Sequence, residues 1–184
     1  MINISESMAI AFQSYRTGQV SHAELICHQI LQQQANCVEA LHLLGVIAHQ
    51  VGNLKQAVFY YQRMVAIKPD HAEAYYSLGV TMGQIGQLEE AIAYYQQAIA
   101  FKPEYTDAHY NLGYALQQQG NLSAAIAHYQ QAIALDPSDA EAHGNLAYAP
   151  STAGPDRGSH CSLPASHYPQ TGCARNLLQP GRYL

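Results

Sequence analysis

The sequence of 184 residues predicts an all-α protein, an α-solenoid of antiparallel helix pairs followed by a disordered C-terminal tail. The first observation behind this prediction is a period of 34 residues, which is typical of solenoids built from helix pairs. The residues that recur at this spacing include Gly45, Gly79 and Gly113, then Tyr61, Tyr95 and Tyr129, then Pro69, Pro103 and Pro137. The second observation is that each period contains two apolar runs with helical spacing. The third is the loss of this periodicity after Ala149, where five of the eight prolines occur.

The period divides the chain into consecutive units, and each complete unit is expected to form a helix, a tight turn, a second helix and a turn. The units are residues 4–37, 38–71, 72–105 and 106–139, followed by an incomplete unit at residues 140–149. In the third unit, apolar residues at helical spacing begin at Tyr75 and begin again at Leu88. Gly86 is a stop signal for the first helix, and Pro103 prevents the second helix from continuing.

The remaining units keep this register to different degrees. Residues 4–37 form a degenerate unit, because Ala35 occupies the position of the proline while Gly18 and Ala23 match the pattern. The units at 38–71 and 106–139 keep their glycine, tyrosine and proline positions, so both are expected to form complete helix pairs. Residues 140–149 supply only a first helix.

The spacing has a physical reason in how helices pack. Small residues such as Gly79 and Ala91 are expected to let the two antiparallel helices of a pair approach closely. The larger Leu78 and Tyr95 are expected to fill the seam between one pair and the next. Because no pair buries its apolar faces alone, stability depends on stacking, and roughly three repeats are needed for a stable array.

This pattern resembles the tetratricopeptide repeat, whose signature runs through an aromatic residue, Leu-Gly, a second aromatic, then alanine, an aromatic, alanine and proline. The third unit matches at Tyr75, Leu78, Gly79, Ala91, Tyr95, Ala98 and Pro103, with Met82 in place of the second aromatic. The resemblance covers residues 4–149. It implies a right-handed superhelix in which the first helix of each pair lines a concave groove, and it implies protein binding as the function.

Composition excludes several classes of partner. Residues 1–149 carry 12 acidic and 5 basic side chains, whereas residues 150–184 carry 1 acidic and 3 basic side chains. An acidic body argues against nucleic acid, because phosphate binding needs a basic face. No apolar run approaches the roughly 20 residues that span a bilayer, and the N-terminal residues do not read as a secretory signal. The four cysteines suggest no disulfide framework, so a cytoplasmic location is expected, with Cys27 as a small buried apolar residue.

No catalytic constellation is found, so the chain is not expected to be an enzyme, and no cofactor or metal is expected. Nothing pairs a nucleophile with a base, and no glycine-rich phosphate loop occurs. The residues His160, Cys161, His167 and Cys173 match no standard zinc spacing. His42 and His49 lie seven residues apart, whereas a metal pair on a helix is more usually three or four apart. We interpret them as polar residues of the groove.

The resemblance places a set of side chains in the concave groove, where they are expected to contact a peptide. The set is His42, His49, Tyr76, Tyr110, Asn111, Tyr114, Asn145 and Tyr148. Tyrosines can stack on a peptide and hydrogen-bond to it, and asparagines can hold an extended backbone because an amide both donates and accepts. A solvated helix face is the alternative interpretation. The groove edge carries Glu39, Glu73, Asp107 and Glu141, so a neutral or basic segment is the expected partner, and a clamp for a carboxylate is not.

The sequence therefore predicts a scaffold that binds an extended peptide segment without catalysis. An alternative is the severed substrate-binding arm of a glycosyltransferase, because the units also resemble the N-terminal arrays of bacterial proteins similar to O-linked N-acetylglucosamine transferases. A third reading is a truncated product without function. The helix at 140–149 lacks the second helix of its unit, so Leu146 and Ala147 are expected to be partly exposed and to permit weak self-association.

We interpret residues 150–184 as a frame-shifted, disordered remnant of further repeats. If one extra base entered near codon 150, the shifted frame is compatible with a sequence that keeps the period. Its glycine, tyrosine and proline would fall 34 residues after Gly120, Tyr129 and Pro137. A disordered tail of ordinary origin is the alternative. Sequencing the coding DNA distinguishes the two.

Overall fold

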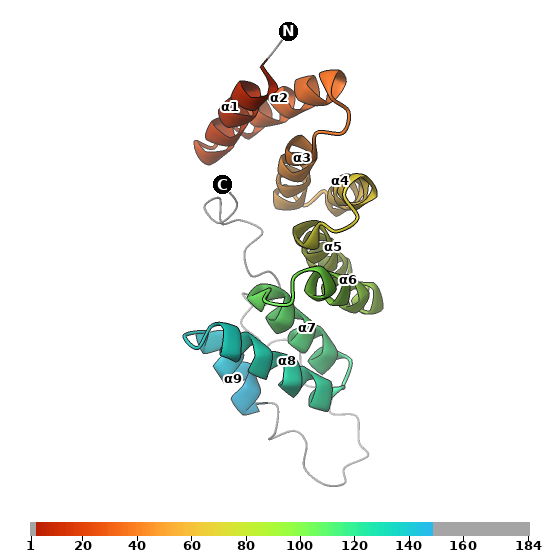
Figure 1. The fold of residues 1–184 in the computed structure, drawn as a ribbon, viewed down its shortest axis with the longest axis vertical. Helices are drawn as coiled ribbons and strands as arrows, with labels where there is room; N and C mark the ends of the chain where they lie inside the picture. The colour runs from red at the N-terminus through yellow and green to blue at the C-terminus, as the bar shows by residue number, and fades with distance from the viewer. Residues whose placement is uncertain (1–2, 149–184) are drawn as a thin grey trace.

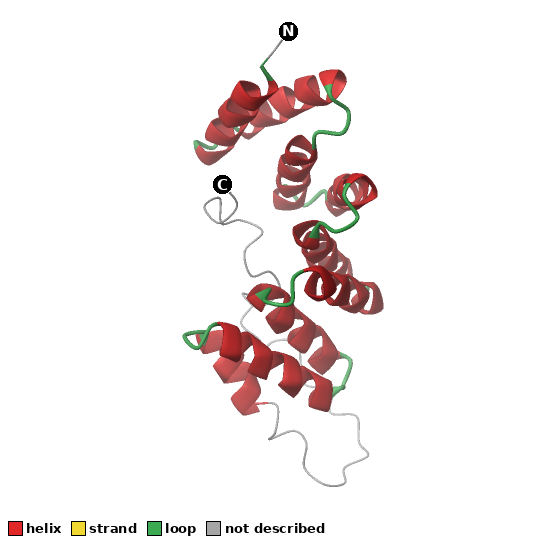
Figure 2. Ribbon diagram, in the orientation of Figure 1, coloured by secondary structure: helices red, strands yellow, loops and turns green. Residues whose placement is uncertain are grey.

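The computed structural model describes residues 3–148, and within this range the chain forms nine α-helices and no strands (Figure 2). The helices are α1 (Ile4–Arg16), α2 (Val20–Gln33), α3 (Val38–Gln50), α4 (Leu54–Ile67), α5 (Ala72–Ile85), α6 (Leu88–Phe101), α7 (Thr106–Gln118), α8 (Leu122–Leu135) and α9 (Ala140–Tyr148). The tail that we interpret as frame-shifted, with its expected disorder, lies outside the described residues. No helix between residues 3 and 148 has both the length and the apolar character needed to cross a membrane.

The helices stack in chain order into the predicted α-solenoid, which confirms the expected fold class (Figure 1). Consecutive helices form the antiparallel pairs α1–α2, α3–α4, α5–α6 and α7–α8, and α9 packs on α8. The stack curves into an arc, with α3 and α5 on its inner side and α4 and α6 on its outer side (Figure 1). The first helix of each pair therefore lines the hollow side of the arc in this part of the chain.

The turn between the helices of a pair depends on a residue with positive φ. Gly86 follows α5 with φ of +88°, a left-handed conformation that glycine adopts without steric cost. The backbone N–H of Gln87 then donates to the carbonyl of Met82 at 2.9 Å, which satisfies one of the last carbonyls of α5. Gly18, Gly52 and Gly120 have the same conformation, so one turn geometry recurs along the array.

The helices of a pair approach closely where the first one carries glycine. A Cβ atom added at Gly79 would lie 2.6 Å from the ring of Tyr95 in α6, and one at Gly113 would lie 2.9 Å from the ring of Tyr129 in α8. Real Cβ contacts are not this short, so any larger side chain would force the ring or the helix to move. Tyr95 thus packs over its own pair, whereas the sequence analysis placed it in the seam between pairs.

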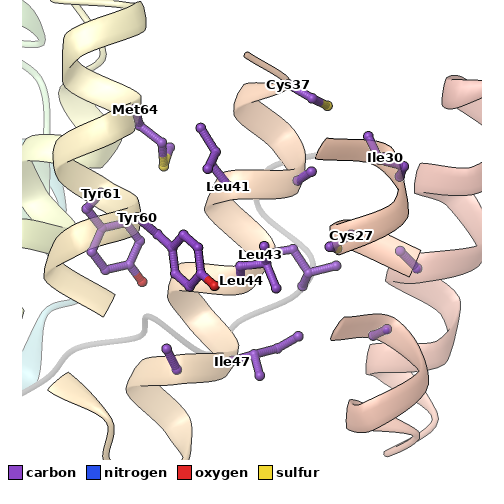
Figure 3. Packing of buried hydrophobic residues seen from close by; sticks show 14 of the residues in the cluster. Cys27, Ile30, Cys37, Leu41, Leu43, Leu44, Ile47, Tyr60, Tyr61 and Met64 are labelled. Carbon is purple, nitrogen blue, oxygen red and sulfur yellow. The ribbon is translucent and has the colours of Figure 1, made fainter. Parts of the chain in front are cut away.

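The seam between pairs is filled by aliphatic side chains, as the packing around α3 illustrates (Figure 3). Leu41 and Leu44 of α3 are at most 1% exposed and pack between α2 and α4. Leu78 of α5 is fully buried in the same cluster, as expected. Cys27 of α2 is also fully buried, which confirms its expected apolar role, and burial raises the pKa of its thiol to about 12.

The last described helix ends with little cover. In α9, Leu146 is half-buried, Ala147 is exposed and Tyr148 is 43% exposed. The self-association expected through this end stays a prediction.

Candidate functional site

The candidate site is the inner face of the arc, which we define by four helical positions on α3, α5, α7 and α9. On α5 these positions hold Glu73, Ser77, Val80 and Gln84, and residues spaced by three or four lie on one side of a helix. The equivalent residues on α7 are Asp107, Asn111, Tyr114 and Gln118. Those on α3 are Glu39, Leu43, Val46 and Gln50, and α9 contributes Glu141, Asn145 and Tyr148. These residues share one side of each first helix, the side that the resemblance to the tetratricopeptide repeat places toward the hollow of the arc.

The middle of the inner face is closed by hydrogen bonds between neighbouring units. The amide Nδ2 of Asn111 donates to the hydroxyl of Tyr76 at 2.9 Å, and Nδ2 of Asn145 donates to the hydroxyl of Tyr110 at 3.0 Å. Each bond joins a residue of one unit to the first helix of the next unit. Tyr76 also packs against the ring of Tyr105, with 4.9 Å between ring centroids.

Three residues of the expected set, Tyr76, Tyr110 and Asn111, lie in the core, and their contact with a peptide stays a prediction. Tyr76 and Tyr110 are each 2% exposed, and Asn111 is 3% exposed. The ring of Tyr76 lies against the rings of Tyr95 and Tyr105, and the ring of Tyr110 lies against that of Tyr129, so a ring stacked on a ligand would have to leave the core. The three residues form the floor of the inner face and set the relation between its helices.

Other residues of the expected set remain accessible. Tyr114 and Asn145 are half-buried, and Tyr148 is exposed. They lie on α7 and α9, toward the C-terminal end of the described chain. The aromatic surface available for a contact is thus gathered at that end of the inner face.

His42 and His49 of α3 are both half-buried and are held in the neutral form. Burial and the nearby His71 lower the pKa of His42 to about 4, and burial lowers the pKa of His49. The imidazole of His42 lies beside Tyr61, with 6.4 Å between ring centroids. Uncharged imidazoles suit hydrogen bonding to neutral groups and do not form a clamp for a carboxylate.

Nε2 of His49 and the hydroxyl of Tyr61 are buried beside the inner face, and neither makes a hydrogen bond of good geometry. Their polar neighbours are the side chains of Gln84 and Ser77. In the fourth unit the equivalent residues are bonded to each other, because the hydroxyl of Tyr129 donates to Oε1 of Gln117 at 2.7 Å. The imidazole of His49 does not reproduce that bond. Unsatisfied buried polar groups cost free energy, so this junction retains unused hydrogen-bonding capacity.

The acidic edge of the inner face is partly neutralised by the chain itself. Glu73 Oε2 lies 3.2 Å from Nδ1 of His71, and its Oε1 lies 3.4 Å from Nζ of Lys102. His71 is the main cause that holds the pKa of Glu73 at about 2, and Lys102 adds to the effect. Glu39 and Glu141 are exposed at the same edge.

The chemistry of this face is that of a contact surface. Within residues 3–148, no group of three or more histidine, cysteine, aspartate or glutamate side chains is arranged to hold a metal ion. The cysteines and histidines of residues 160–173 lie outside the described residues. The inner face presents amides, phenols, neutral imidazoles and carboxylates, which suit hydrogen bonding and aromatic contact.

One contributor to the site, Tyr105, was missed by the sequence analysis. It is 5% exposed at the N-cap of α7, packs on Tyr76 and lies under Nζ of Lys102, which is 4.9 Å from its ring centroid. The equivalent positions in other units hold Cys37, His71 and Asp139. No residue type recurs there, so the period carries no signal for this position.

Family models match four segments of the chain. Models described as tetratricopeptide repeat match residues 38–71, 60–93 and 106–139, and one described as TPR repeat matches residues 84–120. Together they cover residues 38–139 without a gap. A comparison with curated protein sequences finds no match.

Solved structures show the same architecture. A crystal structure of MamA protein superposes with a TM-score of 0.75 at 28% identity, covering 82% of each chain. MamA from Desulfovibrio magneticus RS-1 superposes with a TM-score of 0.74 at 23% identity, which shows the fold alone. A mutant of the O-GlcNAc transferase from Thermobaculum terrenum superposes with a TM-score of 0.64 at 27% identity, covering 72% of this chain and 27% of that one.

Proposed function

Because this chain belongs to the tetratricopeptide-repeat family, we propose that its inner face binds an extended segment of a partner protein and that it catalyses no reaction. The repeats and the similarity to MamA and to the transferase array support a protein-interaction scaffold. The choice of the inner face and of an extended segment is our inference from the geometry described above. Binding of this kind requires only hydrogen bonding, aromatic contact and charge.

The observation that carries this proposal is a row of exposed amides. Gln50, Gln84 and Gln118 occupy the same position near the end of α3, α5 and α7, and all three are exposed. Each first helix would therefore offer one amide to a segment that runs along the inner face. Because an amide donates and accepts, it can bond to the backbone of any sequence.

Charge and accessibility refine the expected partner. The exposed Glu39 and Glu141 favour a neutral or basic segment over an acidic one. Tyr114 and Tyr148 supply aromatic contacts at one end. Cys27 and Cys37 are free thiols, which agrees with the reducing cytoplasm that we propose as the location.

The test begins with peptides selected from a random library displayed on phage, using the full chain as bait. The affinity of one selected peptide is then measured by calorimetry for Gln84→Ala and Gln118→Ala. We expect the double variant to weaken binding about thirtyfold, because two hydrogen bonds at about 1 kcal/mol each are lost.

The matched control is the double variant Gln96→Ala and Gln97→Ala, which removes two exposed amides from α6 on the outer side of the arc. It should bind the peptide as the wild type does. Equal losses in both double variants, or no loss in either, would place the binding surface elsewhere. Circular dichroism checks that each variant keeps its helix content.

A second candidate function is the substrate-presenting arm of a glycosyltransferase. The similarity to the O-GlcNAc transferase favours it, since that match covers 72% of this chain but only 27% of the enzyme. The chain would then present a substrate to a catalytic domain that the described residues do not contain. Sequencing the DNA downstream tests this idea. A glycosyltransferase domain that continues in a restored frame would favour it, and a stop after further repeats would favour the plain scaffold.

A further inference from the structure

A pair of histidines lies between the two helices of the fourth unit, away from the residues used above. Nδ1 of His109 in α7 is 3.2 Å from Nδ1 of His128 in α8, and the ring centroids are 5.4 Å apart. Nε2 of His109 is 2.9 Å from the carbonyl oxygen of Pro103. A carbonyl only accepts, so Nε2 of His109 carries the hydrogen. The neutral ring therefore directs the bare lone pair of its Nδ1 toward His128.

Helix packing does not require histidine at these two positions. The equivalent pair is Leu41 and Tyr60 in the second unit, and Tyr75 and Tyr94 in the third. The two tyrosine rings of the third unit also lie side by side, with 6.4 Å between centroids. The same backbone thus accommodates apolar and aromatic pairs, and the fourth unit alone among the complete units places two imidazoles there.

The spacing of the two nitrogens matches that of two ligands on one metal ion. Zinc binds imidazole nitrogen at about 2.0 to 2.1 Å in a tetrahedral site, which sets two such nitrogens about 3.3 Å apart. A metal-bound histidine commonly donates its other N–H to a backbone carbonyl, and His109 already has this arrangement with Pro103. The carbonyl fixes both the tautomer and the orientation of that ring.

We propose that His109 and His128 form a binding site for one divalent transition-metal ion of the zinc, nickel or copper type. Imidazole suits these ions, and carboxylate-preferring ions such as Mg²⁺ would not bind. The metal takes the place of the hydrogen between the two rings. His128 then carries its hydrogen on Nε2, and each ring rotates so that the lone pairs converge on the metal. Water completes the coordination, since residues 3–148 supply no third ligand of the histidine, cysteine or carboxylate kind.

The site can be reached from solvent through His128. His128 is half-buried, which leaves its outer side open to solvent. A bound metal would connect α7 to α8 and stabilise the fourth unit. This inference does not depend on the proposed peptide binding.

The experiment is a calorimetric titration of the full chain with Zn²⁺ at pH 7.4, together with thermal unfolding with and without the metal. The wild type should bind one equivalent more tightly than the weak background of its other histidines, and its Tm should rise by several degrees. The variant His109→Tyr with His128→Tyr copies the tyrosine pair of the third unit and is expected to fold. It should lose the one-equivalent component and the rise in Tm.

A control variant separates this site from histidine binding in general. His143→Ala removes an imidazole whose Nε2 lies 3.1 Å from the carbonyl of Pro137, the same arrangement as His109 with Pro103. It should keep the one-equivalent component. The single variant His128→Gln should weaken Zn²⁺ binding about tenfold or to background. Cu²⁺ electron paramagnetic resonance should report two nitrogen ligands in the wild type and in His143→Ala, but not in His128→Gln. Equal Zn²⁺ binding by the wild type and the double-tyrosine variant, or no tight component in the wild type, would overturn the proposal.

Discussion

Two glycines of α5 allow the close packing of a helix pair to be measured. Replacing either Gly79 or Gly83 by alanine adds one methyl group and improves helix propensity by about 1 kcal/mol. At Gly79 the new Cβ would lie 2.6 Å from the ring of Tyr95, which is only 4% exposed and cannot swing into solvent. At Gly83 the nearest atoms would lie at 4.0 Å, an ordinary contact. Overpacking a filled core costs about 1 to 3 kcal/mol.

We therefore expect Gly79→Ala to be less stable than Gly83→Ala by about 1 to 3 kcal/mol, since the propensity gain is common to both. Urea unfolding followed by far-ultraviolet circular dichroism measures this difference, and Gly83→Ala should equal or exceed the wild type. If Gly79→Ala were as stable as Gly83→Ala, the ring of Tyr95 would not be in contact with Gly79. The proposed reason for the recurring glycine would then be wrong.

Three further outcomes follow from the inner face. His49→Gln should raise the free energy of unfolding by about 1 kcal/mol. The glutamine can accept from the hydroxyl of Tyr61, as Gln117 accepts from Tyr129 in the fourth unit. A lower free energy of unfolding in urea would contradict this. Tyr110→Phe should cost about 1 kcal/mol, because Nδ2 of Asn145 loses its acceptor; a double-mutant cycle with Asn145→Ala that gave no coupling would refute it. His42→Tyr should flatten the dependence of Tm on pH. The pKa of His42 falls from 6.5 to about 4 on folding, so the unfolded chain binds the extra proton, and the stabilisation present above pH 6.5 is lost as the pH falls toward 4. An unchanged slope in that window would show that His42 does not contribute.

The part of the site that depends on the period was predictable, and its burial was not. The sequence placed Tyr76, Tyr110 and Asn111 on the side of the first helices that lines the hollow of the arc. The structure shows that the same side chains are buried. Their hydrogen bonds run between residues 35 positions apart, one more than the period, so they join a tyrosine of one unit to an asparagine of the next. A one-unit pattern contains no signal for such a bond.

The contact between His109 and His128 was also not predictable from the sequence pattern. When the units are aligned, the two positions hold Tyr75 and Tyr94 in the third unit and histidines in the fourth. The sequence pattern does not pair them, because 19 residues separate the two histidines and no standard metal motif has that spacing. Only the packing of α7 on α8 brings the two nitrogens together.

The sequence by itself determined the helices, the turns and the order of stacking. These follow from local chemistry repeated every 34 residues: apolar spacing, glycine with positive φ, and proline that stops a helix. The tertiary structure decided which side chains of the inner face stay accessible, such as Gln84 and Tyr114, and which become its floor, such as Tyr76. The physical reason is that exposure depends on the distance between helices of neighbouring units, and that distance results from the packing of the whole array.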